Sequence, residues 1–98
     1  MDLAELTVLM HRFVEARGWY APNSPKPQSP RNLASSLVVE AAEVLELFQW
    51  SEATPIKEAL ASELADVALY LLQLASMSEI DLEQAILDKL ENNYERVW

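Results

Sequence analysis

Apolar residues recur every three or four positions over most of this chain, and that spacing predicts α-helices. The first helix is expected to begin after Asp2, a residue suited to cap a helix N-terminus, and to run to about Arg17, before Gly18. Residues 19–30 hold four of the five prolines and are therefore predicted to form a loop. No stretch alternates apolar and polar residues at the period of a strand, so the expected fold class is all-α.

Two further helices are expected in the middle of the chain. The second follows Pro30 and is predicted to end near Ser51. The third is predicted to start with Thr54 as its N-cap and Pro55 in the first helical position, where proline is favoured, and to end near Ser78.

The fourth helix is expected to begin at Asp81, where Gln84 three residues later completes a start that resembles a capping box. Four helices within 98 residues predict one small domain, residues 1–98. A single glycine and an apolar content of 51% indicate a chain that folds.

Acidic residues interrupt the apolar pattern of the second and third helices at matching places. The apolar stripes of these helices consist of Leu37, Ala41, Val44 and Phe48, and of Leu60, Leu64, Val67 and Leu71. Glu40 and Glu43 lie on one edge of the first stripe. Glu63 and Asp66 lie on the same-handed edge of the second stripe. If the helices pair antiparallel around a turn near Ala53, both acidic pairs reach one side of the hairpin. Glu43 is then opposite Glu63, and Glu40 is opposite Asp66.

Four carboxylates in one small volume repel each other, and a divalent cation with oxygen ligands relieves that repulsion. We therefore expect a metal site that uses Mg²⁺, with Mn²⁺ as an alternative. A solvated-surface explanation stays open, because 16 acidic residues produce such spacings readily, as at Asp88 and Glu91. Glu46 fits a plain surface role equally well. His11 is the only histidine, so the Glu-x-x-His pairs of a ferritin-like di-iron site are absent.

The net charge of −9 argues against nucleic acid or an anionic membrane as a partner. The N-terminus does not resemble a signal peptide, and the longest apolar run, VALYLLQLASM, is shorter than a membrane span. The absence of cysteine is compatible with a reducing compartment, so the expected location is the cytoplasm. The third helix is apolar on nearly all sides, which predicts burial between subunits of a homo-oligomer, either a dimer or a tetramer.

Several motifs together resemble the MazG-like, all-α nucleoside triphosphate pyrophosphohydrolases. They are P-R-N-L-A at 30–34, E-x-x-E at 40–43, E-V-L-E-L-F-Q-W at 43–50, E-L-A-D-V-A-L-Y at 63–70 and D-K-L at 88–90. The combination is most similar to the dCTP pyrophosphatase branch and covers most of the chain. The resemblance implies a four-helix unit that assembles into an intertwined helical-bundle dimer or a dimer of dimers.

The resemblance also implies roles for individual residues. It implies that the four converging carboxylates bind Mg²⁺ and that Tyr70, Lys89 and Asn93 contact the phosphates. It also implies that Trp19 and Trp50 enclose the base.

The chain departs from the family pattern at two places. Val39 stands where the signature E-E-x-x-E has its first glutamate, which leaves the catalytic base and the number of metal ions open. The loop at 19–30 is longer and richer in proline than the dCTP-type version, with Gln28 near the place of an expected histidine. The base preference is therefore open as well.

The expected reaction is Mg²⁺-dependent hydrolysis of a (deoxy)nucleoside triphosphate at the α-phosphorus, which releases a nucleoside monophosphate and pyrophosphate. Such an enzyme would serve nucleotide-pool house-cleaning. Arg96 is a further candidate for phosphate binding, and Glu43 or Glu46 is the candidate for orienting the attacking water. The alternatives are a non-enzymatic acidic helical module that oligomerises or binds a partner, and a phosphoribosyl-ATP pyrophosphohydrolase.

Overall fold

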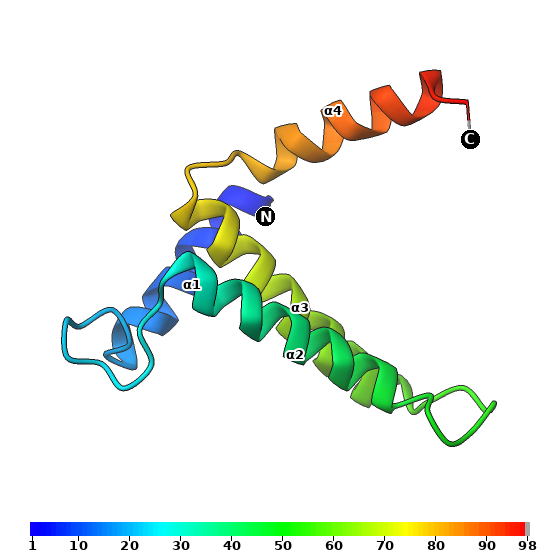
Figure 1. Cartoon of the computed structure of the whole chain (residues 1–98), viewed down its shortest axis with the longest axis horizontal. Coiled ribbons are helices and arrows are strands. Elements are labelled where there is room, and N and C mark those ends of the chain that lie inside the picture. Colours follow the sequence, from blue (N-terminus) through cyan, green and yellow to red (C-terminus); the bar gives the residue numbers. More distant parts are fainter. Residues whose placement is uncertain (98) are drawn as a thin grey trace.

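The computed structural model describes residues 1–97, which form α-helices and no strand. The helices are α1 (Leu3–Ala16), α2 (Pro30–Glu46), α3 (Lys57–Met77) and α4 (Leu82–Glu95), as shown in Figure 1. The predicted all-α class is confirmed.

Short polar side chains cap three of the four helices. Asp2 and Asp81 cap α1 and α4 as predicted, because each carboxylate accepts a hydrogen bond from the backbone N–H three residues later, at 2.9 and 3.1 Å. Ser29 caps α2 in the same way, with its hydroxyl 3.2 Å from the backbone nitrogen of Asn32. Gly18 follows α1 with a φ of 73°, a left-handed conformation that glycine adopts without strain.

The predicted end of α2 is wrong, because the helix stops at Glu46 rather than near Ser51. The backbone N–H groups of Leu47, Phe48 and Gln49 donate to carbonyl groups three residues back, at 3.2, 3.0 and 3.3 Å. These tighter turns replace the α-helical hydrogen bonds and lead the chain out of the helix.

The predicted start of α3 is also wrong. Ile56 directly precedes the first helical residue, and its ψ of 128° is that of an extended chain. Pro55 therefore cannot occupy the first position of this helix, because Ile56 after it is not helical. No side chain caps this end, and Thr54 is not the N-cap. The helix starts at Lys57 and ends at Met77, close to its predicted end.

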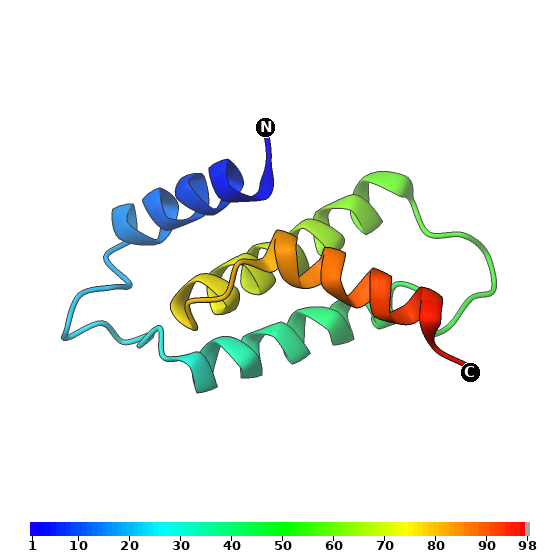
Figure 2. The same cartoon turned by 90° about the horizontal axis from the view of Figure 1, so that it is seen from above.

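The α2 and α3 helices form an antiparallel hairpin, the arrangement that the carboxylate spacing required (Figures 1 and 2). The α1 helix packs against α3, while α4 leaves the end of α3 and diverges from the hairpin (Figure 1). The hairpin therefore carries most of the helix–helix packing.

The core of the single chain is small. Met10 and Val14 of α1 pack against Leu72 of α3, and Leu33 of α2 is 1% exposed. Many other large apolar side chains are exposed, including Leu64, Leu69 and Leu71 of α3 and Ile86, Leu87 and Leu90 of α4. The α3 helix is therefore not buried within one chain, although its composition predicts burial.

By length and composition alone, α3 could cross a membrane, since it has 21 residues and is apolar enough for a membrane span. The apolar run VALYLLQLASM, shorter than a membrane span, is only one part of this longer helix. One such helix is weak evidence for a membrane protein, because the central helix of a bundle passes the same test. Here α3 lies against both α1 and α2.

Candidate functional site

Carboxylates from α2 and α3 meet on one side of the hairpin. Glu40 and Glu43 come from successive turns of α2, and Glu63 faces them from α3. One carboxylate oxygen from each residue lies within 4.8 Å of the others, and all three side chains are half-buried. The antiparallel pairing thus brings together three of the four predicted metal ligands.

Asp66, the fourth predicted ligand, lies beside this trio, but it is not one of the residues whose oxygens all lie within 4.8 Å of one another. Its negative charge raises the pKa of both Glu40 and Glu63, and it lines the same cavity as Glu40. Asp66 is therefore the member of the acidic cluster that, with Glu40, lines the cavity.

The acidic cluster perturbs its own members. The pKa of Glu40 and the pKa of Glu63 are both raised above the ordinary value of 4.5, first because the carboxylates lose water and next because each interacts with the carboxyl group of Glu43. The charge of Glu46 adds to the rise at Glu63. Without a cation, the site therefore destabilises the charged form of its own side chains.

Two oxygens of the cluster are unsatisfied. Glu40 Oε2 and Glu63 Oε2 are buried, and within residues 1–97 neither accepts a hydrogen bond. A buried charged oxygen without a partner is costly. Glu40, Glu43 and Glu63 would hold a divalent cation through carboxylate oxygens, and an all-oxygen donor set is the kind that Mg²⁺ and Mn²⁺ prefer. The residues present therefore fit a hard divalent cation.

Glu46, the other candidate for activating water, is exposed in the last turn of α2. It lies outside the trio of ligand oxygens, but its negative charge contributes to the raised pKa of Glu63. Its catalytic role stays a prediction.

A cavity of about 390 Å³ extends from the acidic cluster between α1, α2 and α3. Its wall from α1 is apolar, and its polar side chains are those of Glu40, Asp66, Tyr70 and Gln73. The last three lie four and then three residues apart on α3, a spacing that places them along one face of the helix. One side of the cavity is thus apolar and the other is lined with polar groups.

Trp19 forms part of the wall of this cavity. Its ring meets the ring of Phe13 edge-on at 5.7 Å between centroids, and the Nζ of Lys26 lies 4.9 Å from its centroid. Trp50 is 89% exposed and follows α2, at the far end of the hairpin from the loop that carries Trp19 (Figure 1). One chain therefore does not bring the two predicted base-binding tryptophans together.

Of the predicted phosphate contacts, only Tyr70 lines the cavity. Lys89 and Asn93 lie on α4, and Arg96 follows its last residue. Because α4 diverges from the hairpin, one chain does not gather these three residues around Tyr70 (Figure 1). Asn93 Oδ1 is buried and has no hydrogen-bond partner within residues 1–97.

Gln73 was not among the predicted site residues, although it lies in the same sector of α3 as Tyr70. Its side chain is only 3% exposed, and its Nε2 donates to Gln28 Oε1 at 2.8 Å and to the Tyr20 hydroxyl at 3.3 Å. A polar position on an apolar helix was the available signal, but the partners in the loop were not predictable from periodicity.

His11 takes part in the same network. Its Nδ1 lies 2.5 Å from the Tyr20 hydroxyl and its Nε2 lies 2.7 Å from Ser76 Oγ. Burial raises the pKa of Tyr20. Both ring nitrogens of His11 thus have hydrogen-bond partners within the described chain.

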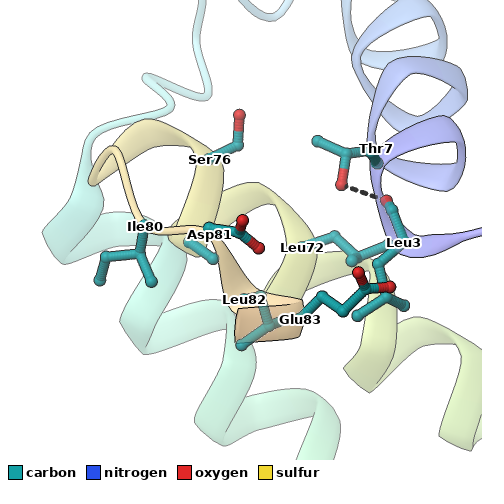
Figure 3. Close-up of a pocket in the computed structure, with 10 residues that line it drawn as sticks. Leu3, Thr7, Leu72, Ser76, Ile80, Asp81, Leu82 and Glu83 are labelled. Carbon is teal, nitrogen blue, oxygen red and sulfur yellow. Dashed lines mark hydrogen bonds between the residues drawn. The ribbon is translucent and has the colours of Figure 1, made fainter. Parts of the chain in front are cut away.

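A second cavity, of about 290 Å³, lies at the corner where α4 leaves α3 (Figure 3). Leu3, Leu72 and Leu82 line it, together with the carboxylates of Asp81 and Glu83. Asp81 already caps α4, and neither residue belongs to the acidic trio. The cavity beside the acidic cluster is therefore the better candidate for a functional site.

The chain is similar to proteins of one family. The model of the MazG-like family matches residues 35–97. The dCTP pyrophosphatase 1 of Mus musculus is 38% identical and that of Homo sapiens is 36% identical, each over 103 residues. These alignments cover 96% of this chain and 58% of the relative, so the chain spans a little over half the length of these relatives.

The fold has a solved counterpart as well. The crystal structure of a pyrophosphatase from Archaeoglobus fulgidus superposes with a TM-score of 0.79 and is 35% identical. The match covers 94% of this chain and 88% of that chain. The resemblance inferred from the motifs is thereby confirmed. Since the family model spans most of the chain and includes all four carboxylates of the acidic cluster, the chain belongs to the MazG-like family.

Proposed function

We propose that this protein hydrolyses deoxynucleoside triphosphates, dCTP or a similar nucleotide, to the monophosphate and pyrophosphate. The observation that carries the proposal is the trio of Glu40, Glu43 and Glu63 beside a cavity large enough for a small ligand. The names of the similar proteins, dCTP pyrophosphatase 1 and pyrophosphatase, support the same reaction class.

The four carboxylates Glu40, Glu43, Glu63 and Asp66 would hold Mg²⁺. When bound, a divalent cation offsets the charge of the carboxylates and the triphosphate and lowers the pKa of water. Without it, the acidic cluster would repel a polyanionic substrate.

The residues of the chain contribute orientation and proton transfer. The oxygen of a water molecule forms a bond to the α-phosphorus, the bond from that phosphorus to the bridging oxygen breaks, and pyrophosphate leaves. The carboxylate of Glu43 or Glu46 orients the water and accepts its proton. Tyr70 donates a hydrogen bond to the phosphates, and Trp19 stacks against the base.

We also propose that the working form is a homo-oligomer, a dimer or a tetramer. The exposed apolar side chains of α3 and α4 need cover, and a second copy of the chain provides a matching surface. In such an assembly Lys89, Asn93 and Arg96 would contact the phosphates and Trp50 would help to enclose the base, although one chain does not gather them.

Product identification tests the proposal. The protein is incubated with dCTP and Mg²⁺, and the products are separated by ion-exchange chromatography. Release of dCMP and pyrophosphate is the expected result. Release of dCDP and orthophosphate would exclude attack at the α-phosphorus, and no turnover of any nucleoside triphosphate would favour a non-enzymatic helical module.

A further inference from the structure

Gln73 is a buried polar side chain at the wall of the nucleotide cavity. It is 3% exposed and shares that wall with Trp19 and Tyr70. Burial of an amide costs free energy of folding unless its polar atoms have hydrogen-bond partners. Its partners therefore indicate what the amide can still bind.

Both hydrogens of the Gln73 amide are already used. Nε2 donates one to Gln28 Oε1 at 2.8 Å and the other to the Tyr20 hydroxyl at 3.3 Å. The remaining polar atom is Oε1, and both side-chain hydrogen bonds of Gln73 within residues 1–97 are made by Nε2 rather than by this oxygen. An amide normally offers donors and an acceptor. Here the loop holds the donors, so only an acceptor is left for a ligand.

The acceptor lies apart from the acidic cluster along α3. Gln73 is seven residues beyond Asp66, which corresponds to about 10 Å along the helix axis. Both residues line the cavity, with Tyr70 between them. A nucleotide whose phosphates lie at the carboxylates would therefore extend its base toward Gln73.

We propose that Gln73 Oε1 accepts a hydrogen bond from the exocyclic amino group of the base and makes Gln73 a specificity-determining residue. This inference rests on the proposed function. Cytosine carries an amino donor at the position where uracil and thymine carry an oxygen acceptor. An oriented carbonyl oxygen thus favours the amino base and opposes the keto base, because two acceptors repel and stay unpaired.

The loop at 19–30 sets this preference through Gln28 and Tyr20. Without Gln28, the amide of Gln73 is free to turn and present Nε2 as a donor. The long loop is then an element that fixes the orientation of the base-reading amide, in addition to forming part of the wall.

The test compares kcat/KM for dCTP and dUTP, whose bases differ at C4, where cytosine has an amino group and uracil an oxygen, and at N3, where only uracil carries a hydrogen. Wild-type protein is expected to prefer dCTP, and Gln73→Leu is expected to reduce the dCTP-to-dUTP ratio about tenfold, the loss typical of a buried hydrogen bond. Gln84→Leu on the exposed face of α4 is the matched control and should leave the ratio unchanged.

A second variant keeps the test decisive if Gln73→Leu does not fold. Gln28→Leu should increase kcat/KM for dUTP about fivefold, a gain that loss of structure cannot produce. A wild-type ratio near one, or no rise for dUTP in Gln28→Leu, would overturn the role of Gln73, and so would an unchanged ratio in a folded Gln73→Leu. Pyrophosphate release from both nucleotides in those cases would leave the proposed function standing. If wild-type protein releases no pyrophosphate from either nucleotide, the proposed function itself fails.

Discussion

Glu40 on α2 and Glu63 on α3 face each other with ligand oxygens within 4.8 Å, and each also buries one oxygen without a hydrogen-bond partner in the described chain. The pKa of each carboxyl is raised by loss of water and by acidic neighbours. The same pair thus reduces the stability of the metal-free protein and prepares it to bind a cation.

Magnesium is expected to raise the melting temperature of the wild-type protein. At a free concentration about 100 times its Kd, a ligand that binds only the folded state adds about 2.7 kcal/mol of stability. Glu63→Gln removes one like charge, so its metal-free form should melt at a higher temperature than the wild type and respond little to Mg²⁺. Circular-dichroism melts in EDTA and in Mg²⁺ measure both effects.

Glu58→Gln is the control for this experiment, since Glu58 is an exposed residue in the first turn of α3. It should keep the full response to Mg²⁺. An equal response in Glu58→Gln and Glu63→Gln would show that the cation binds elsewhere.

Removal of a predicted metal ligand should abolish most activity. Asp66→Asn or Glu43→Gln is expected to lower kcat/KM for dCTP by about a hundredfold or more, because the metal contributes several kcal/mol to the transition state. Pyrophosphate release at saturating Mg²⁺ measures the loss. Glu91→Gln, an exposed change on α4, should remain within about twofold of the wild type, and full activity in Asp66→Asn would remove Asp66 from the site.

The stability of the metal-free protein should depend on pH in an unusual direction. A carboxyl group whose folded pKa is raised binds more protons in the folded state than in the unfolded state, so the free energy of unfolding falls as the pH rises. The fall should begin near the ordinary value of 4.5 and continue through the raised pKa values of Glu40 and Glu63.

Urea unfolding at a series of pH values in EDTA measures this slope. The groups facing these two carboxyls are Glu43, Asp66 and, for Glu63, Glu46. A Glu40→Gln, Glu63→Gln double variant should show a flatter profile. A profile that rises with pH in this window for the wild type would contradict the shifts.

A charge in the exposed apolar face of α4 should dissociate the proposed oligomer. Leu90 is 51% exposed in the single chain, and Leu90→Glu is expected to reduce the mass of the particle to that of one chain. Size-exclusion chromatography with light scattering measures the mass. Asn92→Glu adds the same charge at an exposed neighbour and should leave the assembly intact, while a monomeric wild type would refute the proposal.

Helical spacing accounts for what could be predicted of the acidic cluster. Glu40 and Glu43 are three residues apart, and so are Glu63 and Asp66, so the backbone geometry alone places each pair on one edge of its helix. Their equal distance from the turn then predicted that Glu43 lies opposite Glu63, and in the structure one carboxylate oxygen of each lies within 4.8 Å of the other. The error at the end of α2 left this pairing unaffected, because the turns at 47–50 lie beyond the acidic residues.

The sequence by itself thus determined the helices and the meeting of the carboxylates, since both follow from a local repeat of 3.6 residues per turn. Only the tertiary structure decided that Gln73 would bind Gln28, 45 residues away, and that the turn after α2, which carries Trp50, would lie at the opposite end of the hairpin from the loop that carries Trp19 (Figure 1). A proline-rich loop has no such repeat, and its path depends on the side chains that it contacts. The orientation of the buried Gln73 amide could therefore be known only from the folded structure.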